Sequence, residues 1–214
     1  MLSRYTLRLL TNQQFDRTAT LTCALEYMRR EGLVPGDSPI EIGLWIGGGS
    51  DSAPNSLRRA REMVDKMLEE DRPLNRFMLN KCPWCDEPIV PDRRSPVSSY
   101  GVAFTNSGLT LSCPCSECAF HEALPVQVVD ECMYDRPPSI LLATIDKFAR
   151  LPWQARARSF FGSGGDQDYL PPSLVIQDEL HLISGPLGTI ASIYEGAIDQ
   201  VLQRHGGRPK YVAA

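Results

Sequence analysis

The sequence feature that most constrains the fold is a short apolar run that ends in two acidic residues. Ser173–Gln177 reads SLVIQ and follows two prolines, which is typical of a buried strand in a parallel sheet. Asp178 and Glu179 come directly after it, and His181 completes the sequence Asp-Glu-Leu-His. Ligands of open α/β sheets bind at the carboxyl ends of the strands, where one carboxylate can hold Mg²⁺ and another can orient a water. A strand that simply ends in solvated acids is the alternative that these residues leave open.

The Asp-Glu-x-His element resembles motif II, the Walker B box, of superfamily 2 DExH-type helicases. Residues 139–149, SILLATIDKFA, predict a second strand that runs into a helix, and they are similar to the segment that precedes motif II in these enzymes. Residues 208–214, RPKYVAA, look like the strand that leads to motif III. Residues 4–14, RYTLRLLTNQQ, are similar to motif Ia of the helicases that resemble the helicase component of DISARM anti-phage systems. The resemblance therefore covers nearly the whole chain.

This resemblance implies a fold and a set of site residues. The fold would be α/β, an incomplete RecA-like sheet of the P-loop NTPase type that runs from motif Ia through motif II. Asp178 would hold Mg²⁺, Glu179 would polarise the attacking water, and His181 would couple the nucleotide site to the strand-binding face. The expected nucleic-acid contacts are Arg8, Thr11, Gln14, Gly47, Gly48 and Lys147.

A run of three glycines, Gly47–Gly49, follows a predicted strand over residues 39–46. Glycines after a strand suit phosphate binding. However, the four lysines of the chain follow Asp65, Asn80, Asp146 and Pro209, so no Gly-Lys pair and no Walker A loop is present. The glycines are therefore expected to let the backbone turn or approach a nucleic-acid strand, with a flexible surface loop as an equal alternative.

Five of the seven cysteines lie between Cys82 and Cys118 in metal-ligand spacing. Cys82 and Cys85 form a C-x2-C knuckle, and Cys118 belongs to a second cysteine-rich segment, which predicts a closed thiolate Zn²⁺ site with a structural role. The fourth ligand is Cys113 or Cys115, because C-x4-C and C-x2-C are both sterically possible. The resembled helicases mostly show C-x4-C, which favours Cys113 and leaves Cys115 as the alternative.

Helical periodicity marks three further segments. Apolar residues recur at helical spacing from Phe15 to Met28, with Thr11 as the expected cap, and again over residues 55–72 and 185–206. The formal charge of -4 and the isoelectric point near 5.4 exclude a global polycation, so nucleic acid would need a local patch. Without a long apolar span or a signal-peptide pattern, the chain is predicted to be cytoplasmic, with no membrane partner.

These patterns divide the chain into three predicted parts. Residues 1–79 and 123–214 form the two parts of the RecA-like domain, and residues 80–122 form a zinc-binding insertion. The predicted function is part of an ATP-dependent DNA helicase or translocase of an anti-phage defence system, which acts on a single strand or a duplex junction.

Motif I and a second RecA-like domain are missing from the pattern. The chain is therefore expected to be inactive alone and to work with the remainder of the helicase polypeptide or a complementing subunit, which would supply the ATP site. The alternative from another class is a non-catalytic, zinc-containing module that binds nucleic acid or a protein partner.

Overall fold

The structure is a computed structural model that describes residues 1–5, 8–46, 53–105, 108–148, 151–163, 169–177 and 185–213. Its described strands form a six-stranded sheet in the order β5-β2-β6-β1-β7-β8 and a separate hairpin, β3-β4. Every pairing in the larger sheet is parallel. With its flanking helices, this sheet confirms the predicted α/β fold class and is consistent with a fragment of a RecA-like domain.

The bounds of the strands are β1 Leu2–Tyr5, β2 Ile42–Trp45, β3 Val102–Thr105, β4 Gly108–Leu111, β5 Val126–Gln127, β6 Ile140–Thr144, β7 Leu174–Gln177 and β8 Lys210–Ala213. The α-helices are α1 Arg8–Arg30, α2 Leu57–Glu69, α3 Asp130–Asp135, α4 Ile145–Phe148 and α5 Gly185–Arg204. Short 3₁₀ helices span Val97–Ser99 (η1), Leu151–Trp153 (η2) and Ala155–Phe161 (η3).

Side chains of the central strands alternate between two hydrophobic clusters, one on each face of the sheet. Ile42 and Leu44 of β2 pack into the first cluster, which also contains Phe15 of α1. Trp45, the next residue of β2, packs into the second cluster with Phe148. Burial of each large side chain contributes about 1.5–3 kcal/mol to stability. Because both faces are covered, the strands read as nearly continuous apolar runs rather than as alternating patterns.

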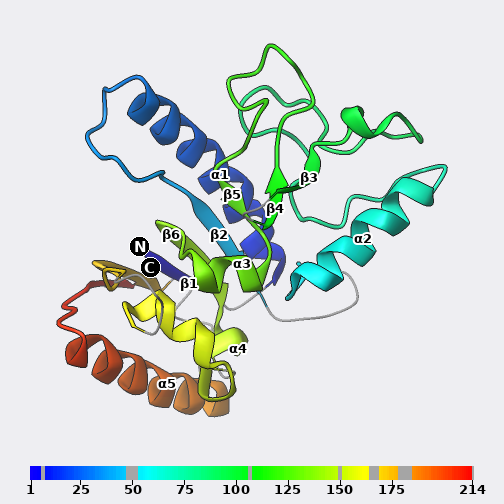
Figure 1. Ribbon diagram of the computed structural model, residues 1–214. Helices are drawn as coiled ribbons and strands as arrows, with labels where there is room; N and C mark the ends of the chain where they lie inside the picture. The colour runs from blue at the N-terminus through cyan, green and yellow to red at the C-terminus, as the bar shows by residue number, and fades with distance from the viewer. Residues whose placement is uncertain are drawn as a thin grey trace.

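Helices cover the two faces separately. α1, α2 and the β3-β4 hairpin lie on one side of the sheet, and α4 and α5 lie on the other (Figure 1). α2 begins where Ser56 caps it, because the Ser56 hydroxyl accepts the backbone N–H of Arg59 at 3.2 Å. Its buried stripe is Ala60, Met63, Val64 and Met67. Because both faces are covered, the segments that connect strands and helices lie at the amino and carboxyl ends of the strands.

α1 begins earlier than the sequence pattern predicts. The first strand ends at Tyr5, and the helix begins at Arg8, so Thr11 lies inside the helix rather than at its cap. Phe15, Ala19 and Cys23 are each fully buried, four residues apart, against the sheet. Packing of this stripe, with good helix formers such as Leu9 and Leu10 before it, favours the earlier start over capping by Thr11.

The cysteine-rich segment contains a β-hairpin that was not among the elements expected from the sequence. β3 and β4 pair antiparallel from Val102↔Leu111 to Thr105↔Gly108. Gly108 has a φ of +116°, and a Cβ atom there would come within 2.6 Å of the Cys132 sulfur. Only glycine fits both conditions. Cys82 and Cys113 join the same hydrophobic cluster as α1, so this segment packs directly on the sheet-covering helix.

Candidate metal centre and the carboxyl edge of the sheet

Because the central strands are parallel, their carboxyl ends lie side by side along one edge of the sheet, called here the carboxyl edge. β1 pairs with β6 through Tyr5↔Thr144 and with β7 through Arg4↔Gln177. In the sequence, Asp178 and Glu179 come immediately after Gln177. These two acids and His181 lie outside the described residues, so the structure gives no geometry for motif II itself. It does describe the strand that precedes them, as the second strand from one end of the sheet.

The other predicted nucleic-acid contacts also follow the ends of these strands. Arg8 and Thr11 lie in the first turns of α1, which comes soon after β1. Gln14 is half-buried on the same helix. Gly47 and Gly48 lie outside the described residues and follow Ile46 in the sequence, directly after β2. The described backbone is therefore compatible with one shared edge for these segments.

Lys147 occupies a different environment from the one expected for a nucleic-acid contact. It is 5% exposed, and its ammonium forms an ion pair with Asp130 Oδ2 at 2.5 Å and donates to the carbonyl of Ile46 at 3.1 Å. A contact with phosphate would require this buried ion pair to open. The structure therefore places Lys147 inside the fold, where its charge is already paired.

The same pair holds the chain on both sides of the glycine-rich segment. Lys147 binds the carbonyl of Ile46, the last described residue before this segment. The backbone N–H of Asp130 donates to the carbonyl of Pro54, just after it, at 3.2 Å. Glu131 also accepts the backbone N–H of Leu57 at the start of α2, at 2.8 Å. The beginning of α3 thus anchors the segment from Pro54 to Leu57 that leads into α2.

Four cysteine sulfurs form a candidate metal centre. The Sγ atoms of Cys82, Cys85, Cys113 and Cys118 all lie within 4.8 Å of one another. Cys82 and Cys118 are 3.8 Å apart, and Cys85 and Cys113 are 3.4 Å apart. A tetrahedral ion with Zn–S bonds of about 2.3 Å needs sulfurs roughly 3.8 Å apart. The donor set therefore fits one tetrahedral metal ion.

Backbone hydrogen bonds shape both cysteine loops. In the first loop, the backbone N–H of Cys82 donates to the carbonyl of Glu87 at 2.8 Å, and the N–H of Asp86 donates to the carbonyl of Cys82 at 3.0 Å. Asp86 takes a φ of +62°, which lets the chain turn around the two sulfurs. In the second loop, Cys113 N–H donates to Phe120 at 3.0 Å, and the N–H of Phe120 points to the Cys118 sulfur at 3.5 Å. The sulfurs are thus preorganised by the backbone.

Burial and hydrogen bonds together shift the pKa values of these thiols. It raises the pKa of Cys82 to about 11 and also raises the pKa of Cys113. At Cys85 burial has the same tendency, but hydrogen bonds from the Glu87 backbone and neighbouring thiols outweigh it, so its pKa is lowered. Thiolates packed this closely repel one another unless a cation lies between them. A bound metal ion would supply that charge and displace the protons.

Cys115 and His121 lie in the same segment but outside the cluster of four sulfurs. Among the described residues, the sulfur of Cys115 is not part of the group that shares the 4.8 Å limit. The imidazole Nδ1 of His121 lies 2.9 Å from the carbonyl of Cys113. Of the two sequence alternatives for the fourth ligand, the geometry favours Cys113 over Cys115.

The sequence patterns miss the side chains that attach this segment to α1. Tyr27 stacks on Trp84 with ring centroids 4.9 Å apart. Arg30 lies over the ring of Phe120, 4.9 Å from its centroid. In the sequence, Trp84 lies within the first knuckle and Phe120 lies two residues after Cys118. Their positions do not indicate which residues of α1 they contact.

A cavity of about 630 Å³ opens at the opposite, amino edge of the sheet. Its lining includes Met1, Ser139 and Ser173, which lie at the starts of β1, β6 and β7. Among the residues that the structure describes, none of the predicted site residues lines it. Among the described helices, none combines the length and apolar character that a bilayer crossing requires.

Comparison with curated proteins identifies a relative of this chain. No protein-family model matches the sequence. DISARM protein DrmA of Bacillus paralicheniformis is 33% identical over an alignment of 252 residues, which includes 100% of this chain and 22% of the relative. The chain therefore spans less than a quarter of the length of that relative.

Proposed function

The similarity of the whole chain to DISARM protein DrmA supports a DISARM-related family, and on that premise we propose that the chain is part of an ATP-dependent DNA helicase or translocase in an anti-phage defence system. Its substrate is DNA, as a single strand or a duplex junction. Its partner is the remainder of the helicase polypeptide or a complementing subunit. Each of these statements concerns the complete protein, of which this chain is one part.

The observation that carries the proposal is the common edge of the parallel strands. β1, β2, β6 and β7 all point the same way, and the predicted functional segments follow β1, β2 and β7 in the sequence. Open α/β sheets bind their ligands at this edge. A strand of a superfamily 2 helicase that carries motif II would end there as β7 does.

Each motif II residue has a distinct role in this proposal. A Mg²⁺ ion, which Asp178 would hold, would supply positive charge that stabilises the phosphates during hydrolysis. Asp178 holds this ion, Glu179 orients and polarises the attacking water, and His181 couples the nucleotide site to the strand-binding face. Arg8, Thr11 and Gln14 of α1, with Gly47 and Gly48, contact the backbone of the tracked strand. Phosphate contacts of this kind position a protein without reading sequence.

The nucleotide-holding element must come from elsewhere in the complete protein. Phosphate cradling by a P-loop requires a Gly-Lys pair, and no lysine of this chain follows a glycine. Residues 80–122 form a zinc-binding insertion between the two parts of the RecA-like domain, 1–79 and 123–214. In this insertion, Cys82, Cys85, Cys113 and Cys118 hold Zn²⁺ in a closed, structural site.

DNA-stimulated ATP hydrolysis by the complete protein tests the catalytic assignment. We expect Glu179→Gln to lower kcat at least about 100-fold while ATP binding is retained, because the amide keeps the shape and loses the base. Glu69→Gln, an exposed glutamate at the end of α2, is the matched control and keeps wild-type turnover.

Retained turnover in Glu179→Gln would remove this residue from catalysis. If the complete protein bound DNA without any ATP turnover, the alternative function would hold: a non-catalytic, zinc-containing module for nucleic-acid or protein interaction. The four clustered cysteines are the observation that favours this second function, since they do not depend on motif II.

A further inference from the structure

The last turns of α1 pack against the loops that carry the four cysteines. Tyr27 stacks on Trp84 at 4.9 Å with an angle of 30° between the rings. Trp84 in turn meets Phe120 edge-on at 5.5 Å. Arg30 places its guanidinium over Phe120 and donates to the carbonyl of Ala119 at 3.4 Å. One helix thus contacts both cysteine loops through two of its side chains.

The contacted residues are interleaved with the metal ligands. Trp84 lies between Cys82 and Cys85, and Phe120 is two residues beyond Cys118. The backbone of Phe120 forms hydrogen bonds with both Cys113 and the Cys118 sulfur. A shift of the cysteine loops would therefore move the Trp84 and Phe120 rings that contact α1.

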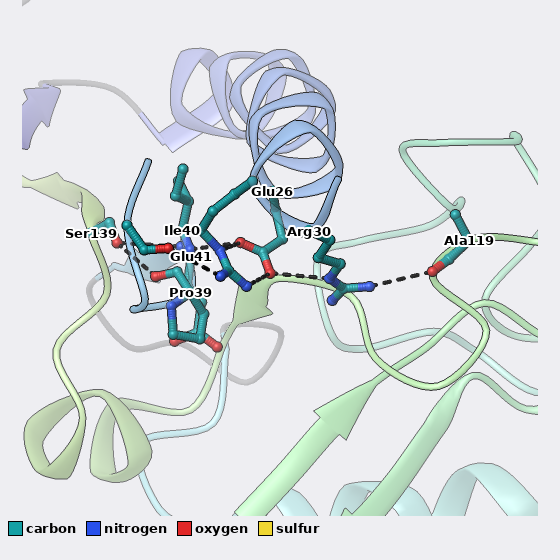
Figure 2. A network of polar contacts seen from close by, with 9 residues as sticks. Glu26, Arg30, Pro39, Ile40, Glu41, Ala119 and Ser139 are labelled. Carbon is teal, nitrogen blue, oxygen red and sulfur yellow. Dashed lines mark hydrogen bonds and ion pairs between the residues drawn. The ribbon is translucent and has the colours of Figure 1, made fainter. Parts of the chain in front are cut away.

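Polar contacts continue from α1 into the sheet. The carboxylate of Glu26, with a side chain 2% exposed, accepts from Arg29 at 2.7 Å and from Arg30 at 3.1 Å. Its Oε2 also accepts the backbone N–H of Ile40, just before β2, at 2.9 Å. Figure 2 shows this path from Ala119 through Arg30 and Glu26 to Ile40. Arg30 is therefore held at both ends, by the cysteine segment and by α1.

We propose that metal binding by the four cysteines and the ordering of the C-terminal half of α1 are coupled through Tyr27 and Arg30, which act as positioning residues. The inference rests on the metal-binding part of the proposed function. Coupling between two sites is reciprocal, so a residue that ligates nothing must then affect metal affinity. The first turns of the same helix carry Arg8 and Thr11, which are proposed to contact DNA.

The first test uses the wild-type 214-residue chain with Zn²⁺ and after its removal by a chelator. Hydrogen exchange is measured for residues 24–30 of α1 and for residues 192–204 of α5. Removal of Zn²⁺ is expected to accelerate exchange in the α1 segment at least about tenfold, since local opening then costs less. Exchange in α5, on the other face of the sheet, should stay the same. Unchanged exchange in residues 24–30 would overturn the coupling.

The second test measures Zn²⁺ affinity by competition with a chromophoric chelator. We expect Tyr27→Ala and Arg30→Ala to weaken Zn²⁺ binding by roughly three- to tenfold each, the size of one aromatic or cation–π contact. Tyr27→Phe keeps the stacked ring and should keep the affinity. Arg17→Ala removes an exposed arginine of the same helix and is the matched control.

The outcomes separate the coupling from the metal site itself. Zn²⁺ affinities within twofold of wild type in both alanine variants would overturn the coupling and leave the metal site standing. No Zn²⁺ binding by the wild-type chain would overturn both. For each variant, hydrogen exchange in α5 at the wild-type rate shows that the chain is folded. The first test, in which a chelator removes Zn²⁺, uses only the wild-type chain.

Discussion

Lys147 and Asp130 form an ion pair inside the protein, with 2.5 Å between Nζ and Oδ2 and side chains only 7% and 4% exposed. The pair joins the helical turn after β6 to the first residue of α3. Its lysine also binds the end of β2. A buried pair of this kind is costly to break from one side only, because the remaining charge has no water to solvate it.

Lys147→Met is therefore expected to lower the free energy of unfolding by about 3–5 kcal/mol. Urea denaturation of the 214-residue chain measures this. Arg58→Met is the control, because it breaks an Arg58–Glu62 pair of similar length, 2.7 Å, whose side chains are 84% and 46% exposed. Exposed pairs contribute only about 0–1 kcal/mol. Equal losses in the two variants would mean that burial does not determine the strength of the Lys147 pair.

Glu26 predicts a distinct acid sensitivity. Hydrogen bonds from Arg29, aided by those from Ile40 and Arg30, lower its pKa from 4.5 to about 2. Its stabilising effect is therefore complete above pH 4.5 and is lost as the pH falls toward 2, and it amounts to about 3 kcal/mol. Glu26→Gln should lower stability at pH 7 but narrow its gap to wild type below pH 4. Glu62→Gln, at an exposed site, should show no such convergence when both are followed by denaturation across this pH range.

The cysteine geometry predicts which substitutions release the metal. One Zn²⁺ per chain is expected in the wild type, with loss in Cys82→Ser and Cys113→Ser, because each removes one of the four clustered sulfurs. Cys115→Ser should keep the metal, since this sulfur lies outside the cluster. Elemental analysis of protein purified without added zinc measures the content. Loss in Cys115→Ser and retention in Cys113→Ser would reverse the ligand assignment.

The chain on its own should not turn over ATP. Asp178 and Glu179 can hold an ion and a water, but without a P-loop lysine nothing neutralises the nucleotide phosphates. ATP binding should be no tighter than about 1 mM, or about -4 kcal/mol. Hydrolysis is measured with Mg²⁺ and DNA present. Steady turnover that disappears in Asp178→Ala would reveal a phosphate-binding element elsewhere in the chain.

The strands were predictable where burial on both faces leaves an apolar run. The strand before Lys147 appears as β6 for this reason. Ser173–Gln177 also contains a strand, β7, although Leu174 and Ile176 are only half-buried. The β3-β4 hairpin could also have been predicted from the sequence, because apolar residues alternate on both sides of Asn106-Ser107-Gly108. The composition of the surrounding cysteine-rich segment, with its prolines and serines, obscured that signal.

The candidate site was predictable only in part. Knuckle spacing identified the cysteines, since chelation by neighbouring thiols is a local property. Lys147 is predicted as a nucleic-acid contact, and its burial against Asp130 could not be predicted, because this partner is 17 residues away in the sequence and meets it only in the folded chain. The contact between Tyr27 and Trp84 is equally non-local. Pairings of this kind depend on tertiary packing, which residue spacing does not encode.

The place of β1 in the sheet has a consequence for how the chain folds during synthesis. Leu2 pairs with Leu141 on one side and with Val175 on the other. Both partners of this early strand are therefore made long after it, and such distant pairings slow folding. Until β6 and β7 leave the ribosome, β1 has two unpaired edges that can associate with other chains. Translation speed and chaperone access should thus influence the yield of folded protein.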